Sequence, residues 1–134
     1  MEMEQTLSII KPDAVERKLI GSIISLIEGN ELKIIEARML RLSRQEAEKF
    51  YNIHRTKPFF ESLVNYISSN KIIALKLEGK DAINKYRKLM GSTDPDNADE
   101  GTIRKLFAES KERNSVHGSD SIENAKTEIK FFFK

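Results

Sequence analysis

Histidine is the first residue type to consider, because a neutral imidazole near pH 7 can act as a nucleophile or exchange protons. The chain has two histidines, and His117 stands among small residues in the segment 114–120. Such a setting favours an accessible ring beside the start of a helix, where backbone N–H groups attract an anion. The spacing alone leaves a second interpretation open, in which His117 is only a loop or capping residue.

The other histidine, His54, is the natural comparison. It follows Tyr51 by three residues and lies in the largely polar stretch 52–57, without small residues around the ring. A solvated or locally hydrogen-bonded side chain is the simpler interpretation of this context. His117 is therefore the better candidate for chemistry.

The first third of the chain predicts two strands separated by a helix. A β-type run covers 6–10, and Pro12 ends it because proline lacks a backbone donor and restricts the residue before it. Leucine and isoleucine recur at helical spacing over 19–27, and the pair 29–30 supplies a left-handed helix exit. Alternation of apolar and charged residues over 33–42 predicts a second strand with one buried face.

A helical hairpin and a central strand are predicted next. Ser43 and Glu46 have the spacing of a capping box. Pro58 suits the first turn of a further helix that continues to Ile67. The nearly continuous aliphatic run 72–77 predicts a central, well-buried strand, and helical spacing returns over 81–90.

The last third of the chain combines a long loop with short elements. Residues 91–101 are turn formers at most positions and predict an extended surface loop, and loops of this length are often functional. Thr102 can cap a short helix, 115–117 fits a brief strand, and a final helix is predicted to begin near Asp120. This order of elements predicts an α/β sandwich and leaves the sheet topology open.

Composition narrows the class of protein. With 134 residues, of which 39% are hydrophobic and 33% charged, the chain fits one globular domain over 1–134. Cysteine is absent, which excludes disulfides, thiolate metal sites and cysteine nucleophiles. The apolar stretch 19–27 is far shorter than the roughly 20 residues of a membrane span, so no membrane span is expected. A net charge of +2 does not indicate a nucleic-acid-binding protein, and the cytoplasm is the expected location.

The segment Asn-Ser-Val-His-Gly-Ser-Asp at 114–120 resembles the active-site signature of the nucleoside diphosphate kinase family. The resemblance extends over essentially the whole chain. It implies an enzyme that transfers the γ-phosphoryl group of a nucleoside triphosphate, typically ATP, to a nucleoside diphosphate by a ping-pong mechanism. The other motifs that carry it are 8–13, Tyr51 with 58–60, 77–79, 91–95 and 101–104.

The resemblance implies a catalytic role for five residues. His117 is the nucleophile, which is phosphorylated on its ring and passes the phosphate onward. Glu128 holds the far nitrogen of the ring, and Ser119 supports this carboxylate, which fixes the tautomer. Tyr51 lies beside the ring, although its spacing also fits a core residue of an amphipathic helix. Lys11 acts in catalysis and in phosphate binding.

The same resemblance implies the substrate site. Cations and a hydroxyl contact the phosphates, an aromatic ring stacks on the base and an amide contacts the sugar. Stacking uses a π face that every base has, so broad nucleotide specificity is implied. Magnesium is implied as a cofactor bound through the nucleotide phosphates, with no protein ligand. The phosphate contacts are Lys11, Arg87, Thr93 and Arg104, the base contact is Phe59 and the sugar contact is Asn114.

The implied fold is a ferredoxin-like α/β sandwich of the α+β type, in which helices cover a four-stranded antiparallel sheet. A homo-oligomer is implied, either a hexamer or a tetramer, and the aromatic tail 131–133 is compatible with burial at a subunit contact. Lys111 departs from the family pattern, because a small apolar residue is expected near the base at this position.

Two other classes of function compete with the kinase. A nucleotide-binding module without turnover is disfavoured because His117, Lys11 and Arg104 are all present. A nucleic-acid-binding domain on the same sheet architecture is disfavoured by the weak net charge, so nucleic acid is not expected as the primary ligand.

Overall fold

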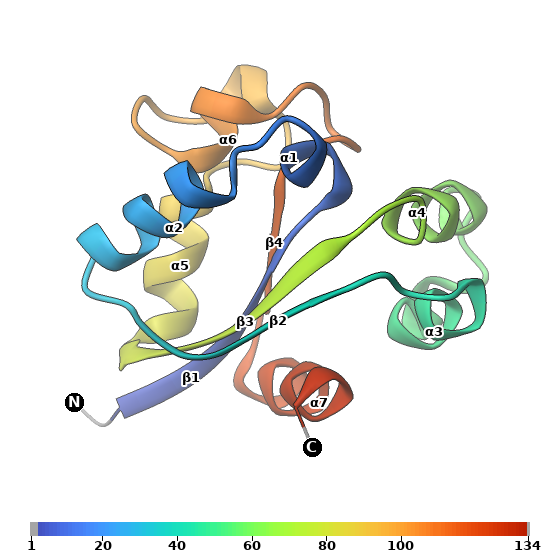
Figure 1. Ribbon diagram of the computed structural model, residues 1–134, viewed down its shortest axis with the longest axis horizontal. Helices are drawn as coiled ribbons and strands as arrows, with labels where there is room; N and C mark the ends of the chain where they lie inside the picture. Colours follow the sequence, from blue (N-terminus) through green and yellow to red (C-terminus); the bar gives the residue numbers. More distant parts are fainter. Residues whose placement is uncertain (1–2, 134) are drawn as a thin grey trace.

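Helices surround one sheet in the computed structural model, which describes residues 3–133 (Figure 1). The elements in chain order are β1 (Met3–Ile10), α1 (Pro12–Glu16), α2 (Ile20–Gly29), β2 (Lys33–Leu40), α3 (Arg44–Phe50), the 3-10 helix η1 (Asn52–His54), α4 (Phe60–Ile67), β3 (Ile72–Lys80), α5 (Ala82–Met90), the 3-10 helix η2 (Pro95–Asn97), α6 (Ile103–Phe107), β4 (Val116–Gly118) and α7 (Ile122–Phe132).

The four strands lie in the order β2-β3-β1-β4, and every neighbouring pair is antiparallel. This arrangement confirms the expected four-stranded antiparallel sheet. β3 is central, as its aliphatic run predicted, because it pairs with β2 on one side and β1 on the other. The short strand β4 pairs with the end of β1, where His117 lies opposite Ile9.

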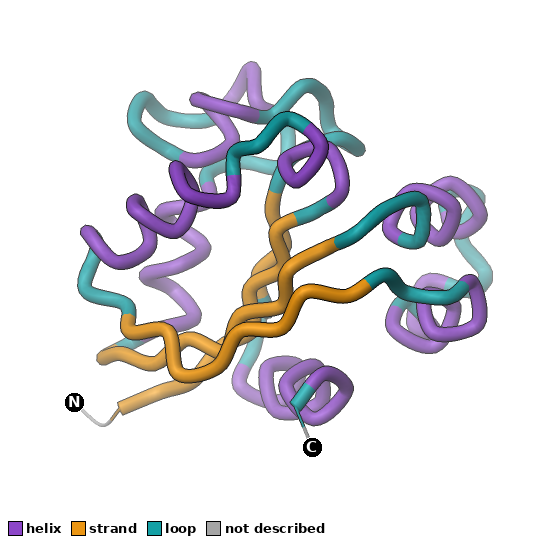
Figure 2. Tube along the Cα trace, viewed as in Figure 1, coloured by secondary structure: helices purple, strands orange, loops and turns teal. Residues whose placement is uncertain are grey.

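Alternating side chains of the central strands enter two hydrophobic clusters, one on each face of the sheet. Ile73 and Leu75 pack with residues of α1, α2, α5 and α6. Ile72 and Ala74 pack with residues of α3, α4 and α7. Figure 2 shows α2 and α5 on one side of the strands, α7 on the other, and α3 and α4 as a pair at one end.

Two helix starts follow the predicted capping chemistry. Ser43 Oγ accepts a hydrogen bond from the Glu46 backbone at 3.1 Å, and Glu46 Oε1 accepts one from the Ser43 backbone at 2.9 Å, which completes the capping box of α3. Thr102 Oγ1 accepts from the Lys105 backbone at 3.3 Å and caps α6. Both predictions are confirmed.

Several predicted boundaries were wrong for local reasons. Pro12 ends β1 but also opens the unexpected helix α1, because a missing N–H and a fixed φ suit a first helical turn as well as they end a strand. Pro58 precedes α4, whose N-cap is Phe59. β2 ends at Leu40, two residues before the predicted end. By contrast, α7 begins at Ile122, near the predicted Asp120, and its N-cap Ser121 accepts a hydrogen bond from a backbone N–H at 3.1 Å.

One further expectation was wrong. The left-handed residue after α2 is Glu31, with φ of 63°, and Gly29 is still helical. In the aromatic tail, Phe132 is buried in the cluster of α3, α4 and α7, whereas Phe131 and Phe133 are only partly buried, so the burial of the tail at a subunit contact stays a prediction. Within 3–133, the helices are all too short or too polar to cross a membrane.

Candidate active site

The imidazole of His117 is held from behind by a carboxylate. Its Nε2 lies 2.9 Å from Glu128 Oε1 on α7, and Ser119 Oγ donates to the same oxygen at 2.8 Å. Because an ionised carboxylate only accepts, Nε2 carries the proton and Nδ1 keeps its lone pair. Nδ1 has no hydrogen-bond partner among residues 3–133, and the side chain is 20% exposed. The structure therefore brings together His117, Glu128 and Ser119, the three residues that the resemblance groups at the ring.

Packing restricts the ring further. Phe50 at the end of α3 meets it edge-on, with centroids 5.4 Å apart and planes at 74°. A Cβ at Gly118 would lie 2.7 Å from the Tyr86 ring and 2.8 Å from Met90, so this position tolerates no side chain. Both contacts were missed from the sequence, where Phe50 is one more apolar residue on a helix face and Gly118 only a small neighbour.

His117 lies between two cavities. The smaller one, about 130 Å³, also contacts Tyr51 and Glu128. The larger one, about 450 Å³, is a polar space that we call the arginine cavity. Its described lining includes two arginines and no carboxylate, which suits an anion. The residues that line it are Arg87, Met90, Gly91, Ser92, Thr93, Arg104, His117 and Gly118.

The guanidinium of Arg104 is fixed by the backbone. It donates to the carbonyls of Val116 at 2.8 Å and Gly91 at 3.2 Å, so it joins β4 to the start of the 91–101 loop. Gly91 has φ of +86°, and a Cβ there would lie 2.6 Å from Thr102 Oγ1, so the close approach requires glycine. Burial lowers the pKa of Arg104 from its ordinary value, but arginine stays charged.

Lys11 is a second buried cation. It is 7% exposed, and the only hydrogen-bond partner of its ammonium group in the described part of the chain is the neutral Oδ1 of Asn114, at 2.9 Å. Burial and, secondly, the charge of Arg104 lower its pKa to about 8, against the opposing charges of Asp13 and Glu112. A buried ammonium that lacks a hydrogen-bonded carboxylate favours an incoming anion.

Tyr51 lines the smaller cavity and not the arginine cavity. It is 8% exposed and lines the smaller cavity with His117. Burial raises its pKa, and the charge of Glu128 raises it further, so the hydroxyl is neutral at physiological pH. His54 lines the same cavity, and burial lowers its pKa.

Phe59 is separate from both cavities. The residue is 46% exposed, and Lys57 Nζ lies over its ring, 5.6 Å from the centroid. Asn114 is buried, and its Nδ2 donates to the carbonyl of Lys111 at 2.9 Å. The Lys111 ammonium lies 3.9 Å from Asp94 Oδ2 and is largely exposed.

A further cavity among residues 3–133 offers no comparable chemistry. A cavity of about 590 Å³ between the start of β1 and α7 is larger, but its described lining mixes Glu4 and Glu78 with Lys126 and Lys130 and has no nucleophile. Among residues 3–133, no cluster of three or more histidine or carboxylate side chains could hold a metal ion. The chemistry therefore concentrates around His117.

Comparison with known proteins points to one family. A family model described as nucleoside diphosphate kinase matches residues 4–134. The nucleoside diphosphate kinase of Lawsonia intracellularis is 55% identical over 98% of this chain and 95% of its own length. That of Wolinella succinogenes is 56% identical over 98% of this chain and 96% of its own length.

Solved structures agree with the sequence relatives. The nucleoside diphosphate kinase of Aquifex aeolicus superposes with a TM-score of 0.97 at 39% identity, covering 99% of this chain and 96% of that one. A halophilic nucleoside diphosphate kinase from Halobacterium salinarum, in complex with CDP, superposes with a TM-score of 0.94 at 38% identity, covering 99% and 89%. The expected ferredoxin-like fold is thereby confirmed.

Proposed function

The chain belongs to the nucleoside diphosphate kinase family, and from this premise we propose which of its residues carry the reaction. The reaction is the transfer of the γ-phosphoryl group of a nucleoside triphosphate to a nucleoside diphosphate. His117 is the nucleophile, and it attacks through Nδ1, the ring nitrogen that Glu128 leaves free.

The first half reaction forms a phosphohistidine. The lone pair of Nδ1 attacks the γ-phosphorus, the bond to the β–γ bridging oxygen breaks, and the nucleoside diphosphate leaves with that electron pair. The ring then carries positive charge, which the Glu128 carboxylate stabilises through Nε2–H. In the second half reaction, a terminal oxygen of another nucleoside diphosphate attacks the phosphorus and the N–P bond breaks.

Four residues hold the phosphates. Arg87, Thr93 and Arg104 line the arginine cavity beside His117, which supports a polyphosphate position there. Lys11 adds a cation next to Arg104. Fixed cations that face charge on the phosphate oxygens lower the barrier without rearranging during the reaction.

Phe59 and Asn114 hold the nucleoside. The exposed ring of Phe59 stacks on the base, and Asn114, which the Lys11 ammonium holds at 2.9 Å, contacts the sugar. Tyr51 packs beside the catalytic ring and excludes water from it. Lys111 lies near the base and links to Asp94 when no nucleotide is bound.

A magnesium ion would be held through the nucleotide phosphates, where it would neutralise part of their charge. The donor set fits this arrangement, because the described lining of the arginine cavity offers cations and hydroxyls and leaves the phosphate oxygens as the ligands for the metal. No protein carboxylate is assigned to the ion.

The chain works as one domain in a homo-oligomer, a hexamer or a tetramer, in the cytoplasm, where nucleoside triphosphates are made and used. The edge position of β2 supports association, since Met39 on this strand is 54% exposed and its outer backbone groups can pair with a second copy. Sedimentation analysis of the purified protein tests the assembly, and a monomer would contradict it.

The observation that carries the assignment is the hydrogen bond between His117 Nε2 and Glu128, which leaves Nδ1 free beside the arginine cavity. Incubation with γ-labelled ATP and magnesium should give an acid-labile, base-stable phosphoprotein that passes its label to GDP. His117→Gln should abolish both steps, and His54→Gln is the matched control that keeps them. Label retained in His117→Gln would exclude this nucleophile, and nucleotide binding without labelling of the wild type would indicate a binding module.

A further inference from the structure

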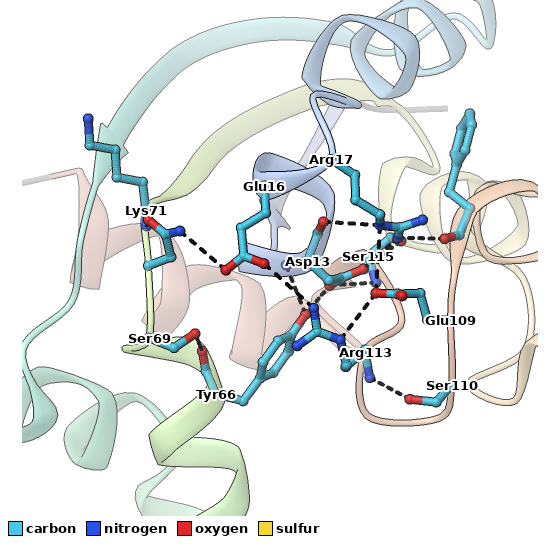
Figure 3. A network of polar contacts seen from close by, with 12 residues as sticks. Asp13, Glu16, Arg17, Tyr66, Ser69, Lys71, Glu109, Ser110, Arg113 and Ser115 are labelled. Carbon is cyan, nitrogen blue, oxygen red and sulfur yellow. Dashed lines mark hydrogen bonds and ion pairs between the residues drawn. The ribbon is translucent and has the colours of Figure 1, made fainter.

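Asp13 is a carboxylate buried near the active site and outside the proposed machinery. Its side chain has no solvent exposure, and its carboxylate accepts four hydrogen bonds from three residues (Figure 3). Oδ1 accepts from the Tyr66 hydroxyl and from the Ser115 backbone N–H at 3.3 Å. Oδ2 accepts from Ser115 Oγ at 3.1 Å and from Arg17 at 2.9 Å. Half of these bonds converge on Ser115.

Ser115 has an unusual backbone. Its φ is 72°, in the left-handed region that a residue with a Cβ rarely adopts, and it lies two positions before His117. Its carbonyl accepts from the Lys11 backbone at 2.8 Å, and the Val116 backbone N–H bonds back to the Asn114 carbonyl at 2.8 Å. The sharp bend at Ser115 thus sets the direction of the chain between the sugar contact and the nucleophile.

Arg17 extends the same network to α6. Its guanidinium bonds the carbonyl of Phe107 at 2.6 Å as well as Asp13, and it lies 3.6 Å from Glu109. α6 carries Arg104, so one carboxylate is linked both to the segment that ends in His117 and to the helix that supplies a phosphate contact (Figure 3).

We infer that Asp13 is a positioning residue for phosphoryl transfer, which holds Ser115 in its left-handed conformation and thereby aligns Asn114, Lys11 and His117. The inference rests on the proposed role of His117. Asp13 itself touches no reacting atom. It acts because Ser115 without the hydrogen bonds to Asp13 would leave its left-handed conformation and shift Asn114 and His117 relative to each other. Small misplacements of a nucleophile slow a reaction strongly.

The test measures the rate of His117 phosphorylation in single turnovers at saturating ATP and magnesium, on folded protein. Asp13→Asn keeps the shape but presents an NH₂ group to donors, so the rate should fall about 10- to 100-fold. Tyr66→Phe is the matched control, because it removes one donor to the same carboxylate and leaves both bonds to Ser115. It should lower the melting temperature while the phosphorylation rate stays close to that of the wild type.

Substitution of Ser115 keeps the test decisive if Asp13→Asn does not fold. Ser115→Ala removes the Oγ bond and keeps the strain, whereas Ser115→Gly removes the bond and the strain together. Glycine should therefore react faster than alanine, and adding Ser115→Gly to Asp13→Asn should restore part of the lost rate. If Asp13 only stabilised the fold, Ser115→Gly would not react faster than Ser115→Ala, since glycine usually lowers stability more than alanine does.

Three results would overturn the inference. The first is a folded Asp13→Asn variant that is phosphorylated at the wild-type rate. The second is a Ser115→Ala variant that reacts at least as fast as Ser115→Gly. The third is a loss of rate in Tyr66→Phe that equals the loss in Asp13→Asn. If the wild type itself forms no phosphohistidine, the proposed function fails, and this outcome is distinct because it appears before any variant is compared.

Discussion

Lys11→Met is expected to stabilise the protein at neutral pH while it slows phosphorylation. Lys11 is buried, and its pKa of about 8 lies below the ordinary value of 10.5. The folded state therefore holds a charged ammonium at pH 7 at the expense of stability, a cost that the charges of Asp13 and Glu112 offset only in part. Methionine fills similar space without a charge.

The size of the effect follows from the two pKa values. The pKa of Lys11 is about 2.5 lower in the folded than in the unfolded state, which corresponds to about 3 kcal/mol of destabilisation of the wild type at pH 7. Lys11→Met removes this cost but also loses the hydrogen bond to Asn114, which takes back about 1 to 2 kcal/mol. The sign with pH is set by proton binding. Between about pH 8 and 10.5 the unfolded lysine keeps a proton that the folded one has lost, so the free energy of unfolding of the wild type rises with pH.

Urea denaturation at pH 7 and pH 9.5 measures this directly. The titration of Lys11 alone should raise the free energy of unfolding of the wild type by about 2 kcal/mol between pH 7 and pH 9.5, and Lys11→Met should lack this increase. The higher pH of 9.5 is chosen because it lies below the ordinary pKa of tyrosine, 10.0. Burial raises the pKa values of Tyr51 and Tyr86, so above pH 10 these two residues would lower the free energy of unfolding. Lys126→Met, at an exposed position on α7, controls for the loss of one positive charge.

A gain of stability with pH that is equal in Lys11→Met and the wild type would refute the reasoning. Lower stability of Lys11→Met at pH 7, together with an unchanged pH dependence, would show that the ammonium is not held in the folded state at a cost. Nucleotide binding supplies an independent check. The affinity of the wild type for a nucleoside triphosphate should weaken as pH rises through about 8, because Lys11 loses its charge.

Three further predictions concern the remaining site. Glu128→Gln should slow His117 phosphorylation about 10- to 100-fold in single turnovers, since the amide holds the ring less firmly; an unchanged rate would contradict the role of the carboxylate. Gly118→Ala should lower the free energy of unfolding by about 1 to 3 kcal/mol in denaturant titrations, because its Cβ would lie 2.7 Å from the Tyr86 ring; equal stability would show that the ring can move. Phe59→Ala should raise KM for ATP, GTP and CTP alike by about tenfold with little change in kcat, and a change confined to one base would exclude simple stacking.

Local signals predicted the elements that depend on local chemistry. The capping box at Ser43 and the N-cap at Thr102 were predicted because the side chain and its backbone partner lie three residues apart. The burial of β3 followed from its aliphatic run, since successive apolar residues point to opposite faces and helices cover both faces of the sheet. Pro12 shows the limit of such signals, because one residue both ends a strand and begins a helix.

The candidate site was predicted in a different way. Periodicity could not show that Glu128 meets His117, because the two are 11 residues apart and belong to a strand and a helix. Only the resemblance to a family joined them, and the structure then supplied the geometry. The contacts of Phe50 and Gly118 stayed hidden because they depend on what packs against each residue, which the sequence around neither residue shows.

Burial of charge is the property that sequence reasoning could least supply. Lys11 and Asp13 are two residues apart and both are buried, yet they do not pair through a hydrogen bond, and their partners Asn114 and Ser115 lie about 100 residues away. The separation has a physical consequence. Asp13 accepts its hydrogen bonds from Ser115, Tyr66 and Arg17, so its charge raises the pKa of Lys11 only in part and it forms no hydrogen bond with the ammonium. A buried ammonium without a hydrogen-bonded carboxylate suits the proposed polyphosphate site, and the fold creates it by turning adjacent side chains toward different partners.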